Sequence, residues 1–346
     1  MGHSRLSSLG LTAIIIALLV PVSAAGQTAP AQWPVPRTPD GQPDLQGVWA
    51  NNVATPLERP EELAAKAALT DEELSELTAR AARLFDGQGD AAFGDSVFQA
   101  ALVAADDFTS SDTATGNYNQ FWLADRHFDH RTSLVVDPPN GRIPPLTKEG
   151  QGRANARADA RLRHAVGPED RALSERCLSF GVPRLGAGYN SYYQLLQAPG
   201  YVVIRMETIH DVRVIPLDGT PHLPSGVRQW HGDSRGHWEG ETLVVDTTNF
   251  SPKINFREYR GSAEHLHTVE RFTRVGPDTI HYEVTVDDPT AWTAPWTVMI
   301  PLKQSPDQIY EFACHEGNVG MEGILAGARA LERAEAATEH TPQGRR

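Results

Sequence analysis

Positive charge is scarce in this sequence. Lysine and arginine together number 31, against 44 aspartates and glutamates, and the formal net charge of the 346 residues is −13. The basic residues form no clustered stripe, whereas nucleic-acid phosphates are bound by clustered Lys and Arg. We therefore expect no binding to nucleic acid or to an anionic membrane surface, and we interpret the acidity as favouring solubility.

Long apolar runs are also lacking, except for one near the N-terminus at residues 9–20. This run follows a short polar, positive start, is broken by Pro21, and is followed by small residues at 22–24. The order is that of a cleaved secretory signal, and the run is too short to span a membrane comfortably. We expect residues 1–24 to be a signal peptide and the mature chain to be periplasmic or secreted, without stable membrane insertion. An uncleaved N-terminal anchor is the alternative.

Cysteine is nearly absent, because only Cys177 and Cys314 occur. No cysteine follows the apolar run, so a lipid anchor of the bacterial lipoprotein type is not expected. Two cysteines in an exported protein are more often bridged than free, and these two flank most of the strand-rich part of the chain. The sequence predicts a Cys177–Cys314 disulfide. Two buried free thiols, or a thiolate metal ligand beside His315, are the alternatives.

Helical patterns are concentrated before the main strand series. Residues 25–44 form a leader rich in Pro, Gln and Ala, which we expect to be extended. Residues 58–86 read as helical, and Thr70 with Glu73 matches a capping box. Residues 87–117 have no clear period and predict a loop or lid.

Two further helices are predicted at 147–164 and 320–337, and short strands are predicted at 119–122 and 131–136. We interpret 58–175 as a helical insertion within one domain that spans 45–340. No internal repeat of fixed period is found.

Alternating strands dominate the rest of the chain, and residues 280–286 are a clear example of apolar and polar residues in period two. The predicted strands are 191–197, 200–207, 211–217, 241–249, 266–275, 279–287, 294–302 and 308–314. Consecutive strands without intervening helices predict a mainly β fold, an antiparallel barrel of about eight or nine strands with peripheral helices. The alternation of 280–287 leaves open whether its polar face lines a lumen or is solvated outside.

The first predicted strand begins with Gly47-Val48-Trp49, which resembles the Gly-x-Trp start of lipocalins. In that family the Trp packs at the closed end of an up-and-down barrel that holds a small molecule. The resemblance implies a lipocalin-like barrel, although more than a hundred residues separate Trp49 from the main strand series.

The mature chain also resembles a family of exported bacterial proteins of unassigned activity. The segments that carry this resemblance are 43–49, 131–145, 175–184, 236–250 and 310–318. It implies an exported protein with one domain, and it implies no catalytic residue.

Aromatic and amide side chains gather at 189–194 and recur near the ends of other strands. Rings with a few amides and one arginine suit a polar-aromatic or sugar-like ligand. The predicted ligand-binding residues are Tyr189, Asn190, Tyr192, Trp230, Asn249 and Arg257. The alternative is that these aromatic residues belong to the core and edges of the sheet, where aromatics are enriched.

An acid/base group is predicted at the turn between two strands, where His210 precedes Asp211. A histidine beside carboxylates is poised near neutral pH. In an enzyme, His210 would be the base, Asp211 or Glu207 would orient it, and Arg213 or Arg257 would hold an anionic group. The alternative is a turn histidine whose neighbour Asp211 caps the loop.

Two other motifs predict no chemistry. Ser234 lies in a Gly-x-Ser-x-Gly pattern, but a strand follows where a nucleophile elbow needs a helix, so a glycine-rich hairpin loop is predicted. His265 and His267 would share one strand face, yet no spacing matches a zinc signature. We therefore predict neither a metal nor a cofactor.

Two functions are consistent with these patterns. The first is an exported protein that binds a small polar-aromatic or sugar-like molecule, and this one is favoured. The second is an exported hydrolase, lyase or isomerase that uses the acid/base residues at the barrel mouth.

Overall fold

The computed structural model of the chain describes residues 33–86, 90–103, 108, 125–187, 189–252 and 264–339. The chain divides into two units, Met1–Pro34 and Val35–Arg346, and the second contains all of the elements below. None of the helices in the described ranges is long and apolar enough to cross a membrane.

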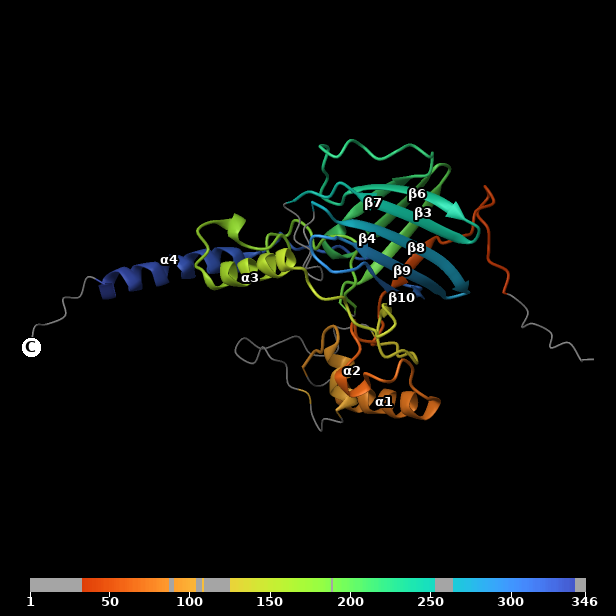
Figure 1. The fold of residues 1–346 in the computed structure, drawn as a ribbon, viewed down its shortest axis with the longest axis horizontal. Coiled ribbons are helices and arrows are strands. Elements are labelled where there is room, and N and C mark those ends of the chain that lie inside the picture. Colours follow the sequence, from red (N-terminus) through yellow and green to blue (C-terminus); the bar gives the residue numbers. More distant parts are fainter. Residues whose placement is uncertain are drawn as a thin grey trace, which may run out of the picture. The chain divides into compact units, whose positions relative to one another are not determined.

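Ten strands of the described chain form a single antiparallel sheet (Figure 1). They are β1 (Gly47–Ala50), β2 (Val135–Asp137), β3 (Tyr192–Ala198), β4 (Tyr201–Met206), β5 (Val212–Pro216), β6 (Asp233–Glu239), β7 (Thr242–Thr248), β8 (His267–Gly276), β9 (Thr279–Asp287) and β10 (Trp296–Ser305). Their order is β5-β4-β3-β1-β10-β9-β8-β7-β6, and β2 pairs with β10. The predicted mainly antiparallel β fold is confirmed.

The short strand β1 occupies the middle of this order. Trp49 lies opposite Tyr193 of β3 on one side and opposite Gln304 of β10 on the other. The Trp49 ring is fully buried, and its Nε1–H donates to the carbonyl of Leu45 over 2.9 Å. Arg274 covers the ring, with its guanidinium carbon 5.4 Å from the ring centroid.

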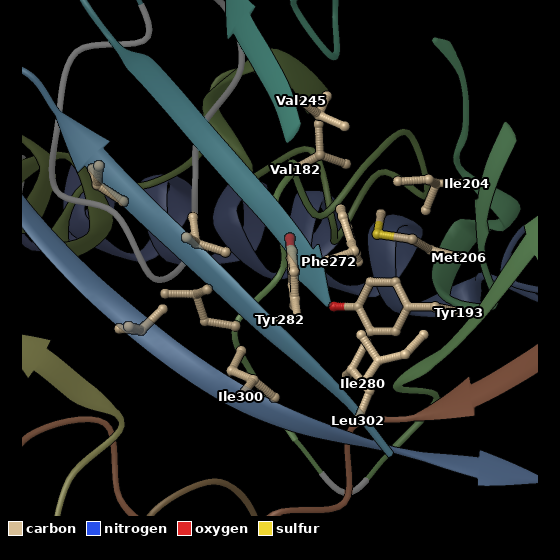
Figure 2. Packing of buried hydrophobic residues seen from close by; sticks show 14 of the residues in the cluster. Val182, Tyr193, Ile204, Met206, Val245, Phe272, Ile280, Tyr282, Ile300 and Leu302 are labelled. Carbon is tan, nitrogen blue, oxygen red and sulfur yellow. The ribbon is translucent and has the colours of Figure 1, made fainter. Parts of the chain in front are cut away.

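The apolar face of β9 points inward. Its alternating residues at 280, 282, 284 and 286 are buried, whereas 281, 283, 285 and 287 are partly exposed. Figure 2 shows side chains of β3, β4, β8, β9 and β10 converging on one space. Phe272 and Tyr282 stack there with ring centroids 4.4 Å apart. The inside of the sheet is therefore a packed apolar core, and the polar face of β9 lies outside it.

The hydrogen-bonded path of the sheet ends at β5 and β6 and is not closed. These two edge strands nevertheless touch through side chains. A Cβ added at Gly236 of β6 would lie 2.6 Å from Cδ2 of Leu217 and 2.9 Å from Cγ2 of Ile215 in β5. Glycine is needed at this position because β5 side chains pack directly on the β6 backbone.

Two strand predictions are wrong. No strand forms at 308–314, because β10, which ends at Ser305, is already paired with β9 on one side and with β1 and β2 on the other. Conversely, 233–239 is the strand β6 and not a hairpin loop. Ser234 is buried in it, and its Oγ lies 2.9 Å from Oγ1 of Thr247. The predicted strand at 119–122 lies outside the described residues.

The helix α1 (Asp71–Leu84) begins as predicted. The Glu73 backbone N–H donates to Thr70 Oγ1 over 3.2 Å, and the Thr70 N–H donates to Glu73 Oε2 over 2.9 Å, so the capping box is confirmed. A second helix, α2 (Ser96–Leu102), forms inside the predicted loop at 87–117. It is short, and it is held by burial of Phe98 against Leu77 and its neighbours in α1.

The two later helices are confirmed as α3 (Lys148–Leu162) and α4 (Val319–Glu339). Thr147 caps α3, since its Oγ1 accepts from the Gly150 N–H over 3.0 Å. Arg329 joins α4 to the segment after α3 by donating to the carbonyls of Ala165 and Val166. Three single-turn 3-10 helices lie at η1 (Glu61–Leu63), η3 (Pro168–Asp170) and η4 (Thr208–His210).

Candidate functional site

A cavity of about 750 Å³ lies outside the packed core of the sheet. Its wall comes from 53–57, from the turn and helix start at 93–96, from Arg126, from the loop at 180–190, and from Thr208 and Phe312. A cavity of this volume suits a drug-sized molecule. Among the described residues it is therefore the best candidate for a ligand site.

Aromatic rings form much of the cavity wall. Phe93 meets Tyr189 edge to face, with ring centroids 6.0 Å apart, and Phe180 meets Phe312 in the same way at 6.5 Å. The guanidinium carbon of Arg184 lies 5.2 Å from the centroid of the Phe180 ring. Edge-to-face rings present both faces and edges to a ligand, which favours flat apolar or aromatic molecules.

A disulfide ties two parts of this wall together. Cys177 and Cys314 are bonded, with their Cα atoms 5.6 Å apart, which confirms the predicted bridge. Cys177 lies just before Phe180 in the sequence, and Cys314 lies just after Phe312. The covalent link therefore keeps these two rings close although most of the sheet separates them in the sequence.

Two predicted ligand residues, Tyr189 and Asn190, line the cavity. Arg184 holds their loop by donating to the carbonyl of Asn190 over 3.0 Å and to that of Tyr189 over 3.1 Å. The Arg184 carbonyl accepts in turn from the Tyr193 hydroxyl over 2.5 Å, which connects the loop to the core. Asn190 has a positive φ of 46°, a conformation that asparagine tolerates better than most residues.

Glu207 is buried directly behind this loop. Burial raises its pKa, while a hydrogen bond from the Asn190 side chain and the charge of Arg184 oppose that rise. Its Oε2 is buried without a hydrogen-bond partner in the part of the chain that the structure describes. Of the four predicted acid/base residues, Glu207 has a side chain that hydrogen-bonds the side chain of a cavity-wall residue, Asn190.

Arg126 brings a second unsatisfied group to the cavity. Its Nη2 donates to the Gly94 carbonyl over 2.8 Å, but Nε and Nη1 are buried and have no partner among the described residues. Desolvation lowers the pKa of Arg126 to about 10, although the charge of Asp95 opposes this shift. The Asp95 carboxylate accepts from the Leu57 backbone N–H over 3.0 Å, and desolvation raises its pKa.

The other predicted acid/base residues point in different directions. His210 is exposed, and no described residue hydrogen-bonds its ring. Asp211 is buried against Ser179 and His231. Arg213 points into the core and pairs with Glu270. The structure therefore does not gather these residues around one point.

The contacts of Asp211 form a cluster that the sequence analysis missed. Ser179 Oγ donates to Asp211 Oδ2 over 2.9 Å, and His231 Nε2 lies 3.2 Å from Asp211 Oδ1 and 3.3 Å from Ser179 Oγ. One imidazole nitrogen thus faces both groups, whereas a catalytic triad uses the two nitrogens separately. Ser179 is also buried and accepts from the Gly181 N–H. The cluster fastens a loop to η4.

Tyr192, Trp230 and Asn249, three further predicted ligand residues, do not line the cavity. Tyr192 is half-buried, and desolvation raises its pKa. Trp230 is 47% exposed. Asn249 has a positive φ of 56° and donates from Nδ2 to the Leu223 carbonyl over 2.8 Å. Arg257 lies outside the described residues.

His222 and His267 meet around Asp246 on the outer face of β7 and β8. His222 Nε2 lies 2.8 Å from Asp246 Oδ1, and His267 Nε2 lies 2.8 Å from Asp246 Oδ2. His222 Nδ1 also lies 3.0 Å from Asp233 Oδ2. Within the described ranges, no group of three or more His, Cys, Asp or Glu residues is arranged to hold a metal ion.

Four residues of the cavity wall were not predicted as site residues, namely Phe93, Arg126, Phe180 and Phe312. They come from separate segments of the chain, so only the fold brings them together. No protein-family model matches the chain, and no curated protein is significantly similar to it.

Proposed function

We propose that this chain is an exported protein that binds a small polar-aromatic molecule in the cavity beside the sheet. The observation that carries the proposal is the cavity itself, with its wall of four rings and a small set of polar groups, including Asn190 and Arg126. Pockets of this composition bury the apolar part of a ligand and fix its orientation through a few hydrogen bonds.

The position of the ligand differs from that in a lipocalin-like barrel. The inside of the sheet is filled by a packed core, so the proposed ligand lies beside the sheet. A closed, lipocalin-like barrel remains part of the proposal, and the contact of Gly236 with Ile215 and Leu217 supports it. Export to the periplasm or to the medium is supported by the disulfide, because such bonds persist in oxidising compartments.

The proposal is tested by purifying the full chain, with its disulfide intact, and analysing the denatured extract by mass spectrometry for a co-purified small molecule. Binding of that molecule is then measured for Tyr189→Ala and for Tyr201→Ala. Tyr201 is a matched control, since it is an exposed tyrosine outside the cavity wall. We expect about a tenfold loss of affinity for Tyr189→Ala, the order of one aromatic contact, and no change for the control. Equal affinities of wild type and Tyr189→Ala would contradict the proposal.

A hydrolase, lyase or isomerase is the second candidate, and Glu207 is the observation that favours it. A buried carboxyl with a raised pKa suits general acid/base work near neutral pH. The co-purified molecule, incubated with the protein and followed by NMR, would be converted in wild type and left intact by Glu207→Gln. Persistence of the molecule with both proteins would leave binding as the function.

A further inference from the structure

We propose that the ligand of this cavity carries a single negative charge, a carboxylate, and that Arg126 binds it. This inference rests on the binding function proposed above and specifies the class of ligand. The observation behind it is a buried guanidinium in the cavity wall whose Nε and Nη1 have no partner among the described residues.

An unpaired buried cation is costly. Removing a charge from water is compensated in proteins only when a counter-ion or a full set of hydrogen bonds replaces the water. Among the described residues, the Arg126 side chain makes one hydrogen bond, from Nη2 to the Gly94 carbonyl, and no ion pair includes it. Nε and Nη1 therefore lack an acceptor.

Asp95 does not supply the missing acceptor. It also lines the cavity and its charge acts on Arg126, but its carboxylate accepts from the Leu57 backbone N–H and forms no hydrogen bond or ion pair with Arg126. Desolvation raises the pKa of Asp95, although the charge of Arg126 opposes that rise. A ligand anion is the group that would complete the hydrogen bonds of Arg126.

The charge and shape of the wall favour a carboxylate over a phosphate. One unpaired guanidinium can neutralise one charge, and a dianionic phosphate would bring a second charge toward Asp95. A planar carboxylate matches the flat guanidinium, and the rings of Phe93, Tyr189 and Phe312 would hold an aromatic body beside it.

Arg131, a partly buried arginine close to Arg126 in the sequence, shows what a paired guanidinium looks like. Arg131 donates from Nε and Nη2 to the Asp129 carboxylate over 3.0 and 2.6 Å, and from Nη1 to the Met299 carbonyl over 2.7 Å. All three of its nitrogens therefore have partners, and Arg131 does not line the cavity. It provides a matched control.

The test uses the full, disulfide-bonded protein and three probes that share one ring system: 2-naphthoate, 2-naphthamide and 2-naphthyl phosphate. Affinities are measured by titration calorimetry, and melting temperatures of the ligand-free proteins are recorded in parallel. We expect the carboxylate to bind at least about tenfold more tightly than either other probe, the order of one charge-assisted hydrogen-bond pair.

Arg126→Met should abolish that preference while leaving the weaker binding of 2-naphthamide unchanged. The melting temperature of the ligand-free variant should stay the same or rise, because an unpaired buried charge has been removed. Arg131→Met should lower the melting temperature and keep the preference for the carboxylate. Arg126→Lys, which retains the positive charge, should keep part of the preference for the carboxylate.

Four results would overturn the inference. Equal affinities for the carboxylate and the amide would remove the charge requirement and leave the proposed binding function intact. Tighter binding of the phosphate would contradict the single charge. Binding of none of the three probes would contradict the aromatic-binding function together with the inference. A fall in melting temperature of Arg126→Met as large as that of Arg131→Met would assign Arg126 a structural role instead.

Discussion

Replacing Glu270 by glutamine would leave the guanidinium of Arg213 inside the sheet without its counter-ion. Glu270 is fully buried on β8, and Arg213 reaches it from the edge strand β5 with only 6% of its side chain exposed. Two guanidinium nitrogens face the two carboxylate oxygens, and the Nη2–Oε1 distance is 2.8 Å. The Tyr282 hydroxyl donates to the same carboxylate over 2.5 Å.

The expected loss of stability in Glu270→Gln follows from the burial of the ion pair. Removing one partner of a buried ion pair costs about 3–5 kcal/mol, because the remaining charge is left without compensation. A domain of ordinary stability unfolds at a cost of about 5–15 kcal/mol, so Glu270→Gln should remove about a fifth or more of the total. Burial and the nearby Glu270 raise the pKa of Tyr282, which therefore stays a neutral donor and cannot replace the lost charge.

The free energy of unfolding is measured by urea denaturation of wild type, Glu270→Gln and the double variant Arg213→Met/Glu270→Leu. The double variant should be more stable than Glu270→Gln, because apolar side chains leave no buried charge. The control is the neighbouring pair Arg271–Glu239, which joins the exposed sides of β8 and β6 over 2.8 Å. Glu239→Gln should cost far less stability than Glu270→Gln, because solvent screens an exposed pair. The reasoning is refuted if Glu270→Gln and Glu239→Gln lose the same stability.

Two further predictions concern the disulfide and the outer histidines. The double variant Cys177→Ser/Cys314→Ser opens a loop closed over a sequence separation of 137 and should lower the free energy of unfolding by about 3–5 kcal/mol. Equal urea midpoints of wild type and the double variant under oxidising conditions would contradict this. The hydrogen bond to Asp246 raises the pKa of His267, although desolvation opposes the rise. The protonated His267 therefore stabilises the fold fully below its ordinary pKa of 6.5, and this stabilisation is lost as the pH rises through the higher pKa of the folded state. The difference in unfolding free energy between wild type and His267→Gln should therefore shrink from pH 6 toward alkaline pH, and a difference that grows would show that the sign is wrong.

Local patterns predicted the elements that local physics determines. The alternation at 280–286 predicted β9, and the pairing of Thr70 with Glu73 predicted the start of α1. Both signals depend only on residues that are close together in the sequence. The disulfide could also be predicted, since only two cysteines exist. Tyr189 and Asn190, which line the cavity, were predicted as ligand residues because rings and amides cluster in consecutive positions.

Features that depend on distant partners could not be predicted. The segment 308–314 alternates like a strand, but both sides of β10 are already hydrogen-bonded, to β1 and to β9. The glycines of 232–236 suggested a loop, although Gly236 is required where β6 packs on β5. His231 and Asp211, like Arg126 and Phe312, meet only after folding, and no spacing along the chain signals such contacts.

The central position of β1 has a consequence for the order in which the chain can fold. β1 lies between β3 and β10, so the hairpins β3-β4-β5 and the series from β10 to β6 are joined in the sheet only by four residues near the start of the chain. Val48 pairs with Ser305, at the far end of the last strand. Contacts this distant in sequence slow folding. A nascent chain therefore cannot complete its sheet until nearly all of it has been synthesised.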